Sequence, residues 1–403
     1  MDQAAHRDFN LSALRRHYTH PHKLYEAMRA HDCIFFDASS QCWLVTGYAP
    51  IVALLDDPRF SSQMGASASM FPPAVSKQML FMDGEAHQRA QSVMLRPLAQ
   101  MVKSMPDDIR ALIQTLLAKA HKRGEIDIVR DFAGPLSLKI IAQVLGIPAS
   151  DEATLQSLER WSDTFGDVTS GYFRGNMQDI RQLEEYFRRL IAIKRHAPSD
   201  DLLSAFILAR DVFSEEELVA NCIMVFTAGR ITTKKLLGDG VPLLAQQWAQ
   251  VRAHYQENPK ATPKWLGEEL LRVITPTRYL MRQALEDVDL SSQFPGKHTI
   301  RQGERLLLFL EAADYDPAVF AQPAHLNPHR RPNKHIAFGF GSHQCPGATL
   351  ARVEIQMALE MLLTSADDLQ PKPGAVPVWN PNPNLGGATA WPLQFKPVAD
   401  GTP

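Results

Sequence analysis

The chain has 403 residues, of which 45% are hydrophobic and 21% are charged, and its formal net charge is −2. This composition is typical of a globular protein with a large core, and the near-neutral charge argues against a nucleic-acid-binding surface. No apolar run reaches the roughly 18 residues of a membrane-spanning helix, so we expect a soluble protein with a short polar N-terminal extension over about residues 1–19.

The chain is mostly helical in pattern, with a few short strands. Residues 42–46 predict a strand and residues 51–55 the helix after it, whereas the Ser-, Ala-, Met- and Pro-rich residues 61–75 predict a loop. Helical patterns recur over residues 87–122, 136–145 and 152–195. After Pro371, turn dipeptides separate short strands: Pro373-Gly374, Asn380-Pro381 and Gly386-Gly387. We predict one mainly α domain over residues 1–403, with a small β portion.

A long central helix is predicted to begin at the capping box Ser214-Glu215-Glu216-Glu217. An apolar run leads into Thr227-Ala228-Gly229-Arg230-Ile231-Thr232-Thr233. The small Ala228–Gly229 pair weakens a helix by up to about 1 kcal/mol, and its use is to let a bulky partner approach the backbone. Thr232 can bend the local hydrogen bonding. The alternative is ordinary helix packing with both threonines bonded to the preceding turn.

Glu269 and Arg272 are three residues apart, so they share one face of a helix. Alone, this spacing describes an ordinary surface ion pair. Here Arg330 follows, fifteen residues before Cys345.

The segment Phe338-Gly339-Phe340-Gly341-Ser342-His343-Gln344-Cys345-Pro346-Gly347 predicts a loop that presents a thiolate to iron. Its three glycines let the backbone turn tightly beside a flat, bulky partner. Cys345 precedes the helical pattern of residues 348–354, whose N-terminus favours the anionic sulfur that a metal needs. Pro346 fits the first helical position. The alternative is a buried structural cysteine.

With Cys345 assigned to a metal, three of the four cysteines remain: Cys33, Cys42 and Cys222. An odd number makes a disulfide framework unfavourable, and a reducing cytoplasm is the simplest setting.

The cysteine segment resembles the haem-binding loop of the cytochromes P450, F-x-x-G-x-[HR]-x-C-x-G, at every fixed position. These positions are Phe338, Gly341, His343, Cys345 and Gly347. The central helix resembles the family's [AG]-G-x-[DE]-T-[TS] pattern at Ala228, Gly229, Thr232 and Thr233, but Ile231 stands at the acidic position. Glu269, Arg272 and Arg330 resemble its Glu-Arg-Arg network, whose role is structural.

The resemblance implies a helical prism-shaped P450 fold and a b-type haem (iron protoporphyrin IX) whose axial ligand is Cys345. It implies that His87, Arg282 and His343 hold the haem propionates, with Gln91 where the family often has arginine. Ala228, Gly229 and Thr232 are the expected catalytic positions, where Thr232 offers a hydroxyl to bound oxygen. The thiolate donates electron density that favours cleavage of the O–O bond.

Family position also gives candidates for the substrate pocket, any of which can be plain core: Met64, Met70, Phe71, Phe165, Tyr172, Val225, Thr277, Leu280 and Leu385. Methionines are typical of adaptable apolar sites. We therefore predict a cytoplasmic, monomeric monooxygenase that inserts oxygen from O2 into a small, largely apolar organic substrate in specialised-metabolite biosynthesis. A ferredoxin and a ferredoxin reductase would supply electrons.

Two alternatives remain. Ile231 leaves open an atypical reaction on the same fold, such as peroxide-driven oxidation, oxidative coupling or dehydration. A non-catalytic haem protein that binds a ligand is the other.

Overall fold

The computed structural model describes residues 10–17, 19, 21–148, 151–172, 176–209, 211–296 and 298–398. Most of the expected N-terminal extension lies outside these residues. Its described part is not simply an extension, because Leu11–Arg16 form helix α1 and Leu14 is buried beside the sheet.

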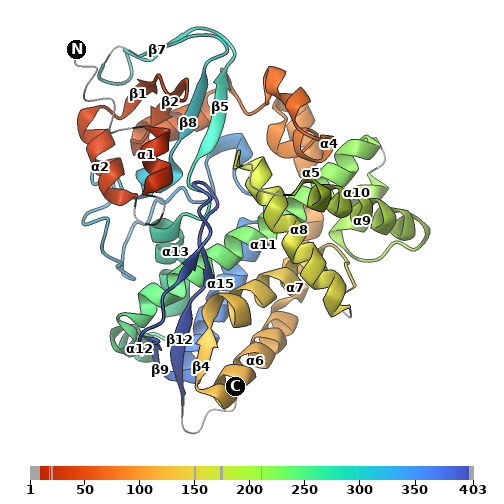
Figure 1. The fold of residues 1–403 in the computed structure, drawn as a ribbon, viewed down its shortest axis with the longest axis vertical. Coiled ribbons are helices and arrows are strands. Elements are labelled where there is room, and N and C mark those ends of the chain that lie inside the picture. The colour runs from red at the N-terminus through yellow and green to blue at the C-terminus, as the bar shows by residue number, and fades with distance from the viewer. Residues whose placement is uncertain are drawn as a thin grey trace.

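A mixed five-stranded sheet stands at one end of the molecule, with strand order β1-β2-β8-β5-β3 (Figure 1). The strands are β1 (Ile34–Asp37), β2 (Cys42–Val45), β3 (Phe60–Ser61), β5 (Leu280–Ala284) and β8 (Arg305–Leu308). β2 and β8 run parallel, and every other pair is antiparallel. The strand predicted over residues 42–46 is confirmed. Helices α2 (His22–His31), α3 (Tyr48–Asp56) and α14 (Leu310–Asp314) accompany the sheet.

The remaining helices form the larger part of the molecule. They are α4 (Pro73–Ser76), α5 (Gly84–Ser104), α6 (Pro106–Arg123), α7 (Gly134–Val144), α8 (Glu152–Thr169), α9 (Met177–His196), α10 (Leu202–Leu208), α11 (Glu215–Ala245), α12 (Trp248–Glu257), α13 (Thr262–Ile274) and α15 (Ala348–Ser365). The predicted mainly α fold with a small β portion is confirmed.

α11 is the central element, and Figure 1 shows it crossing the middle of the molecule with α8 and α9 to one side. It begins at the predicted capping box, in which the Ser214 hydroxyl accepts from the Glu217 N–H and the Glu217 carboxylate accepts from the Ser214 N–H. It contacts α4, α7, α8, α9 and α15, which explains why most of its residues are buried.

Short strands close the other end of the molecule. β4 (Glu125–Asp127), β12 (Pro392–Pro397) and β9 (Ala366–Pro371) form one sheet, and β10 (Val378–Trp379) pairs with β11 (Ala388–Ala390). β6 (Val288–Asp289) and β7 (Thr299–Ile300) form a separate pair. The turns expected after Pro371 do separate short strands.

Three sequence predictions need correction. The pattern over residues 87–122 is two helices, because α5 ends at Ser104 and α6 starts at Pro106. Residues 61–75 are not only loop, because they hold the 3-10 helix η2 (Gly65–Met70) and the start of α4, where Pro73 occupies a first-turn position. The single pattern over residues 152–195 is two helices, since α8 ends at Thr169 and α9 starts after Asn176, whose side chain caps it.

Cys33, Cys42, Cys222 and Cys345 form no disulfide with one another. Among the described residues, no helix is both long and apolar enough to cross a membrane.

Candidate functional site

The loop before α15 presents the thiol of Cys345. The Cys345 N–H donates to Phe338 O at 2.9 Å, which closes the loop. Gly339 and Gly341 both have a φ of 72°, a left-handed conformation that favours glycine. The helix itself starts at Ala348 with Gly347 as N-cap, so Pro346 precedes the helix and does not occupy its first position as predicted.

Opposing effects act on the Cys345 thiol. Burial by surrounding protein atoms dominates and raises the pKa of this thiol above its usual value, while the N–H group of Gly347, the charge of Arg352 and the N–H group of Ala348 offset part of the rise. The sulfur nevertheless remains accessible. An accessible thiol with hydrogen-bond donors aimed at it is suited to ligate a metal as thiolate.

Sequence analysis missed Arg352, on the first turns of α15. Its Nε donates to Glu268 Oε1 at 2.7 Å, and its guanidinium carbon lies 4.7 Å from the centre of the Phe338 ring. Arg352 therefore fixes Phe338 and places a positive charge near the sulfur. Its place in the helical pattern that follows Cys345, seven residues after the cysteine, could have indicated a cation close to the sulfur.

A second cluster gathers groups that bind anions. The rings of His87 and His343 lie with their centroids 4.0 Å apart and their planes tilted by 31°, and Arg282 acts electrostatically on His87. Nη2 of Arg282 is buried and has no hydrogen-bond partner in the described parts of the chain. A buried, unpaired guanidinium nitrogen is costly, so this nitrogen is available to an incoming anion.

Asp83, the N-cap residue of α5, balances this cluster and was also missed. Its Oδ1 lies 3.4 Å from His343 Nε2. Burial acts to raise the pKa of Asp83, but hydrogen bonds from His343, Ser61 and Ser62 outweigh it and hold that pKa well below its usual value. Burial and the positive charge of His343 lower the pKa of His87 to about 4. His87 is therefore a neutral hydrogen-bond donor at pH 7.

Gln91, at the position where the family often has an arginine, reaches the cysteine loop. Its Nε2 donates weakly to Ser342 O at 3.4 Å. It adds a hydrogen bond there but no charge.

One face of α11 is open although the helix is central. Ala228 is exposed and Val225 and Thr232 are half-buried, whereas Thr227 and Arg230 are buried. Positions 225, 228 and 232 follow the three- and four-residue spacing of a single helical face. Accessible space therefore lies along the face that carries the predicted oxygen-binding residues.

Thr232 and Gly229 behave differently from each other. The Thr232 hydroxyl donates to Ala228 O at 2.7 Å, which is the back-bonded arrangement of the alternative interpretation. Its oxygen can still accept a hydrogen bond from a ligand on the open face. Gly229 faces α7, because a β-carbon there would lie 2.6 Å from Ile141 Cδ1. Its small size therefore serves helix packing rather than ligand access.

Ile231 lies between helices. A β-carbon built on Gly166 of α8 would come within 2.5 Å of Ile231 Cδ1 and 3.7 Å of Leu385 Cδ1. The Ile231 side chain therefore packs toward α8 near another apolar side chain, Leu385.

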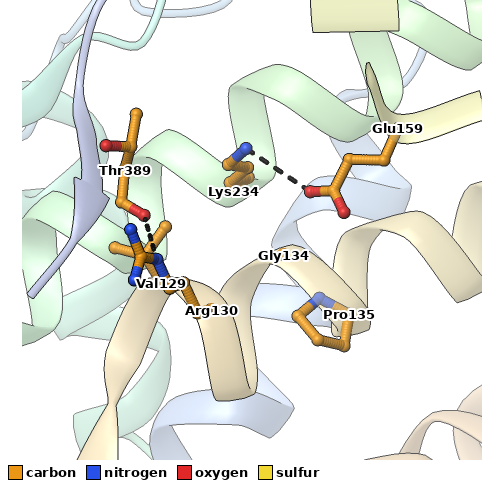
Figure 2. A pocket seen from close by; sticks show the side chains of 7 residues that line it. All are labelled: Val129, Arg130, Gly134, Pro135, Glu159, Lys234 and Thr389. Atoms are coloured by element: carbon orange, nitrogen blue, oxygen red, sulfur yellow. Dashed lines mark hydrogen bonds and ion pairs between the residues drawn. The ribbon is translucent and has the colours of Figure 1, made fainter. Parts of the chain in front are cut away.

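Nearby charges on α11 are engaged by α8. Arg230 is 0% exposed; its Nε donates to Ser162 Oγ at 2.9 Å, and its guanidinium pairs with Glu159 and Asp163. Figure 2 shows the adjoining cavity of about 250 Å³, where Lys234 Nζ lies 3.5 Å from Glu159 Oε1. These cations hold the two helices together and are not free to deliver protons.

The structure brings Glu269, Arg272 and Arg330 together. Arg272 donates to both carboxylate oxygens of Glu269, at 2.8 and 3.0 Å, and Arg330 Nε lies 3.2 Å from each. All three side chains are buried, and Asn333, missed in the sequence, adds a bond of 3.1 Å to Glu269.

The pocket candidates differ in how exposed their side chains are. Met70 is 74% exposed and so is largely open to solvent, whereas Phe165 is 1% exposed and belongs to the core. Leu280 approaches the cysteine loop, because its Cδ1 lies 3.9 Å from a β-carbon built on Gly339. Half-buried positions are Phe71, Tyr172, Val225, Thr277, Leu280 and Leu385, and Met64 is buried at 9% exposure.

These residues fit a haem. The accessible Cys345 thiol would supply a thiolate ligand to the iron, the orphaned Arg282 nitrogen and the two histidines would supply partners for the propionates, and Phe338 could pack against the ring.

Comparison with known proteins points the same way. Residues 265–374 match the family model described as Cytochrome P450. The chain is 30% identical over 380 residues to the polyketide biosynthesis cytochrome P450 PksS of Bacillus subtilis (strain 168), covering 90% of this chain and 91% of that protein. It is 31% identical over 388 residues to the steroid C26-monooxygenase of Mycobacterium tuberculosis (strain ATCC 25618 / H37Rv), with 93% of each covered.

Solved structures agree. The crystal structure of P450BioI with a hexadec-9Z-enoic acid ligated acyl carrier protein has a TM-score of 0.83 and 28% identity, covering 95% of this chain and 100% of that chain. CYP109E1 from Bacillus megaterium with testosterone has a TM-score of 0.84 and 25% identity, covering 94% of this chain and 99% of that chain.

Proposed function

The chain belongs to the cytochrome P450 family of haem-thiolate monooxygenases, and on that premise we propose that it inserts one oxygen atom from O2 into a small, largely apolar organic molecule. The proposal includes a b-type haem, a role in specialised-metabolite biosynthesis, and electrons supplied by a ferredoxin and its reductase. We further propose that residues 1–403 act as one cytoplasmic, monomeric domain.

The observation that carries the proposal is the accessible Cys345 thiol with the Gly347 and Ala348 N–H groups aimed at it. These donors stabilise a thiolate against the unfavourable burial. Arg352 adds a positive charge from the same helix.

When bound, the haem supplies the oxygen-activating chemistry. The protein then has four tasks. Arg282 and neutral His87 would anchor the propionates, Ala228 leaves room beside the α11 backbone, and the Thr232 hydroxyl would accept and pass a hydrogen bond on the open face of α11. The apolar side chains of Val225 and Leu385 would exclude water and contact the substrate.

Ile231 supports a second candidate, an atypical reaction that needs fewer delivered protons. The side chain at the usual acid position is apolar and packs toward Gly166 of α8. We favour oxygen insertion, because Thr232 on an accessible face would have no use if oxygen activation had been abandoned. Ordered water or a substrate hydroxyl would then carry the proton.

The test is the carbon monoxide difference spectrum of the reduced, haem-loaded protein. We expect the red-shifted Soret band that is diagnostic of thiolate ligation, and its loss in Cys345→Ala. Cys33→Ala, which changes a half-buried cysteine near the sheet, is the matched control and should keep the band. If Cys345→Ala retained the band, the axial-ligand assignment would be wrong.

A further inference from the structure

The loop of residues 382–388, which we call the Leu385 loop, brings a candidate pocket residue to α11. Leu385 is half-buried, whereas its neighbours at 382–384 and 386–388 are all buried. Its Cδ1 shares the contact around Gly166 with Ile231 and Thr227. The loop is therefore anchored along its length and directs one half-buried apolar side chain to the contact between α11 and α8.

A buried ion pair on α11 holds one side of this loop. Lys235 Nζ lies 3.1 Å from Asp239 Oδ2 and donates to Gly386 O at 2.6 Å, while Asp239 Oδ1 accepts the Ala388 N–H at 2.7 Å. Lys235 and Asp239 are only 5% and 7% exposed. Two backbone groups of the loop, Gly386 O and the Ala388 N–H, are thus bonded to this one pair.

Gly387 permits the close approach. A β-carbon there would lie 2.8 Å from Asp239 Oδ2 and 2.9 Å from Lys235 Cγ. Any larger residue would push the loop away from the pair.

The other side of the loop is tied to α8. Asn382 Nδ2 donates to Asp167 Oδ1 at 2.7 Å and to Ser170 Oγ at 2.8 Å. Its Oδ1 accepts the N–H groups of Asn384 and Leu385 at 2.9 and 3.0 Å. Leu385 is thus fixed relative to both helices that meet at Ile231.

A buried lysine–aspartate pair is weak evidence for stability, because desolvating two charges costs as much as their attraction returns. Burial also lowers the pKa of Lys235. The pair is better explained by the single loop geometry that its hydrogen bonds select.

We propose that Lys235 and Asp239 are positioning residues that set the place of Leu385 and thereby the size and shape of substrates accepted. The inference rests on the proposed function, since it concerns the space in which the substrate would be held for that reaction. It assigns these residues no contact with substrate.

The probes are imidazole and 4-phenylimidazole, bound to the haem-loaded protein and followed by the Soret shift. Imidazole is small, whereas the phenyl group must share the apolar space with Leu385. We expect the ratio of the two dissociation constants to change at least fivefold in Lys235→Met. Gly387→Ala should produce the same change, because it displaces the loop without removing either charge.

Lys194→Met is the matched control. Lys194 pairs with Asp201 between α9 and α10, with side chains 12% and 4% exposed, and its described hydrogen bonds go to Ser199 and Asp201. It should leave the ratio within twofold, which separates positioning from a general loss of stability. Hydrogen exchange at the Ala388 amide should rise at least tenfold more in Lys235→Met than in this control.

A double-mutant cycle gives the decisive comparison. In a Leu385→Ala background, Lys235→Met should no longer alter the ratio, because the side chain that the pair positions is gone. The inference would be overturned by an unchanged ratio in both Lys235→Met and Gly387→Ala, or by fully additive effects with Leu385→Ala. Normal imidazole binding in the same proteins would leave the proposed function intact. Failure to bind haem or imidazole would overturn both.

Discussion

Ile231 of α11 lies against Gly166 of α8 so closely that a β-carbon on Gly166 would come within 2.5 Å of Ile231 Cδ1. The position that carries an acid in the family pattern is thus a packing position here. Arg230 and Lys234, the adjacent cations, are paired with Glu159 and Asp163 of the same helix α8. α8 and α11 therefore meet through one apolar contact flanked by ion pairs.

This contact predicts a sign change in a double-mutant cycle. Gly166→Ala alone should destabilise the protein by about 1–3 kcal/mol, because it overpacks the helix interface. In an Ile231→Val background, which removes Cδ1, the same substitution should instead stabilise by up to about 1 kcal/mol through helix propensity. Urea denaturation of the four proteins measures both values. Equal effects of Gly166→Ala in the two backgrounds would contradict the contact.

Ile231 also predicts inefficient proton delivery with surrogate substrates. Ile231→Glu should lower the peroxide released per electron pair and raise product formation, since a carboxyl group would stand at the relay position. Oxygen uptake, peroxide and product are measured together. Ile231→Met, another apolar side chain, should leave all three unchanged. The prediction would be contradicted if the unmodified protein already converted most of its electrons into product with unrelated substrates and Ile231→Glu left that fraction unchanged.

The sequence predicted the fold class and the main motifs because each depends on local pattern. The capping box at Ser214 and the strand at Cys42 need only neighbouring residues. Arg352 and Asp83 were missed because their roles depend on partners that are distant in the sequence. Arg352 pairs with Glu268, and Asp83 pairs with His343.

The spacing of residues in the sequence also could not predict which candidate side chains are buried. Met70 and Phe165 are similar pocket candidates by position, yet one is 74% and the other 1% exposed. The Leu385 loop shows the same limit, since its bonds to Lys235 and Asp167 join segments about 150 and 215 residues apart.

The buried carboxylate of Glu269 predicts an asymmetric cost at two adjacent arginines. Arg330→Ala leaves a buried charge underpaired and should cost about 3–5 kcal/mol of unfolding free energy, with loss of bound haem. Arg331→Ala, the control, removes an exposed side chain that stacks on Trp265 at 4.4 Å, and should cost below about 1 kcal/mol. Thermal unfolding and haem absorbance check both. Equal losses of unfolding free energy in Arg330→Ala and Arg331→Ala would show that the buried network stabilises the protein no more than a surface ion pair does.

Pro346 predicts an electron-rich thiolate. The N–H groups of Gly347 and Ala348 reach the Cys345 sulfur, but Pro346 has no N–H to give. Pro346→Leu adds a donor next to the sulfur and should raise the iron reduction potential by about 40 mV, the equivalent of about 1 kcal/mol for one electron. Spectroelectrochemistry measures this shift. Gln344→Leu, on the other side of Cys345, adds no donor and should leave the potential in place; an unchanged value in Pro346→Leu would show that the new N–H does not reach the sulfur.

Asp314 predicts how stability depends on pH. Its Oδ1 accepts the Ile336 N–H at 2.8 Å and its Oδ2 the Thr275 hydroxyl at 2.9 Å, yet burial dominates and raises the pKa of Asp314 to about 7. Between about pH 4 and pH 7 the folded protein keeps a proton that the unfolded chain has released, so the unfolding free energy must fall as pH rises through this window. The total contribution is about 4 kcal/mol, and it is flat above the window.

Asp314→Asn removes this titration while keeping a carbonyl oxygen for the Ile336 N–H. The difference in unfolding free energy between the variant and the unmodified protein should therefore shift in favour of the variant by up to about 4 kcal/mol between pH 4 and pH 8. Urea denaturation at successive pH values measures the difference, in which the contributions of all other carboxyl groups cancel. Parallel curves for the two proteins would mean that Asp314 is ionised throughout, and that the Ile336 and Thr275 hydrogen bonds outweigh its burial.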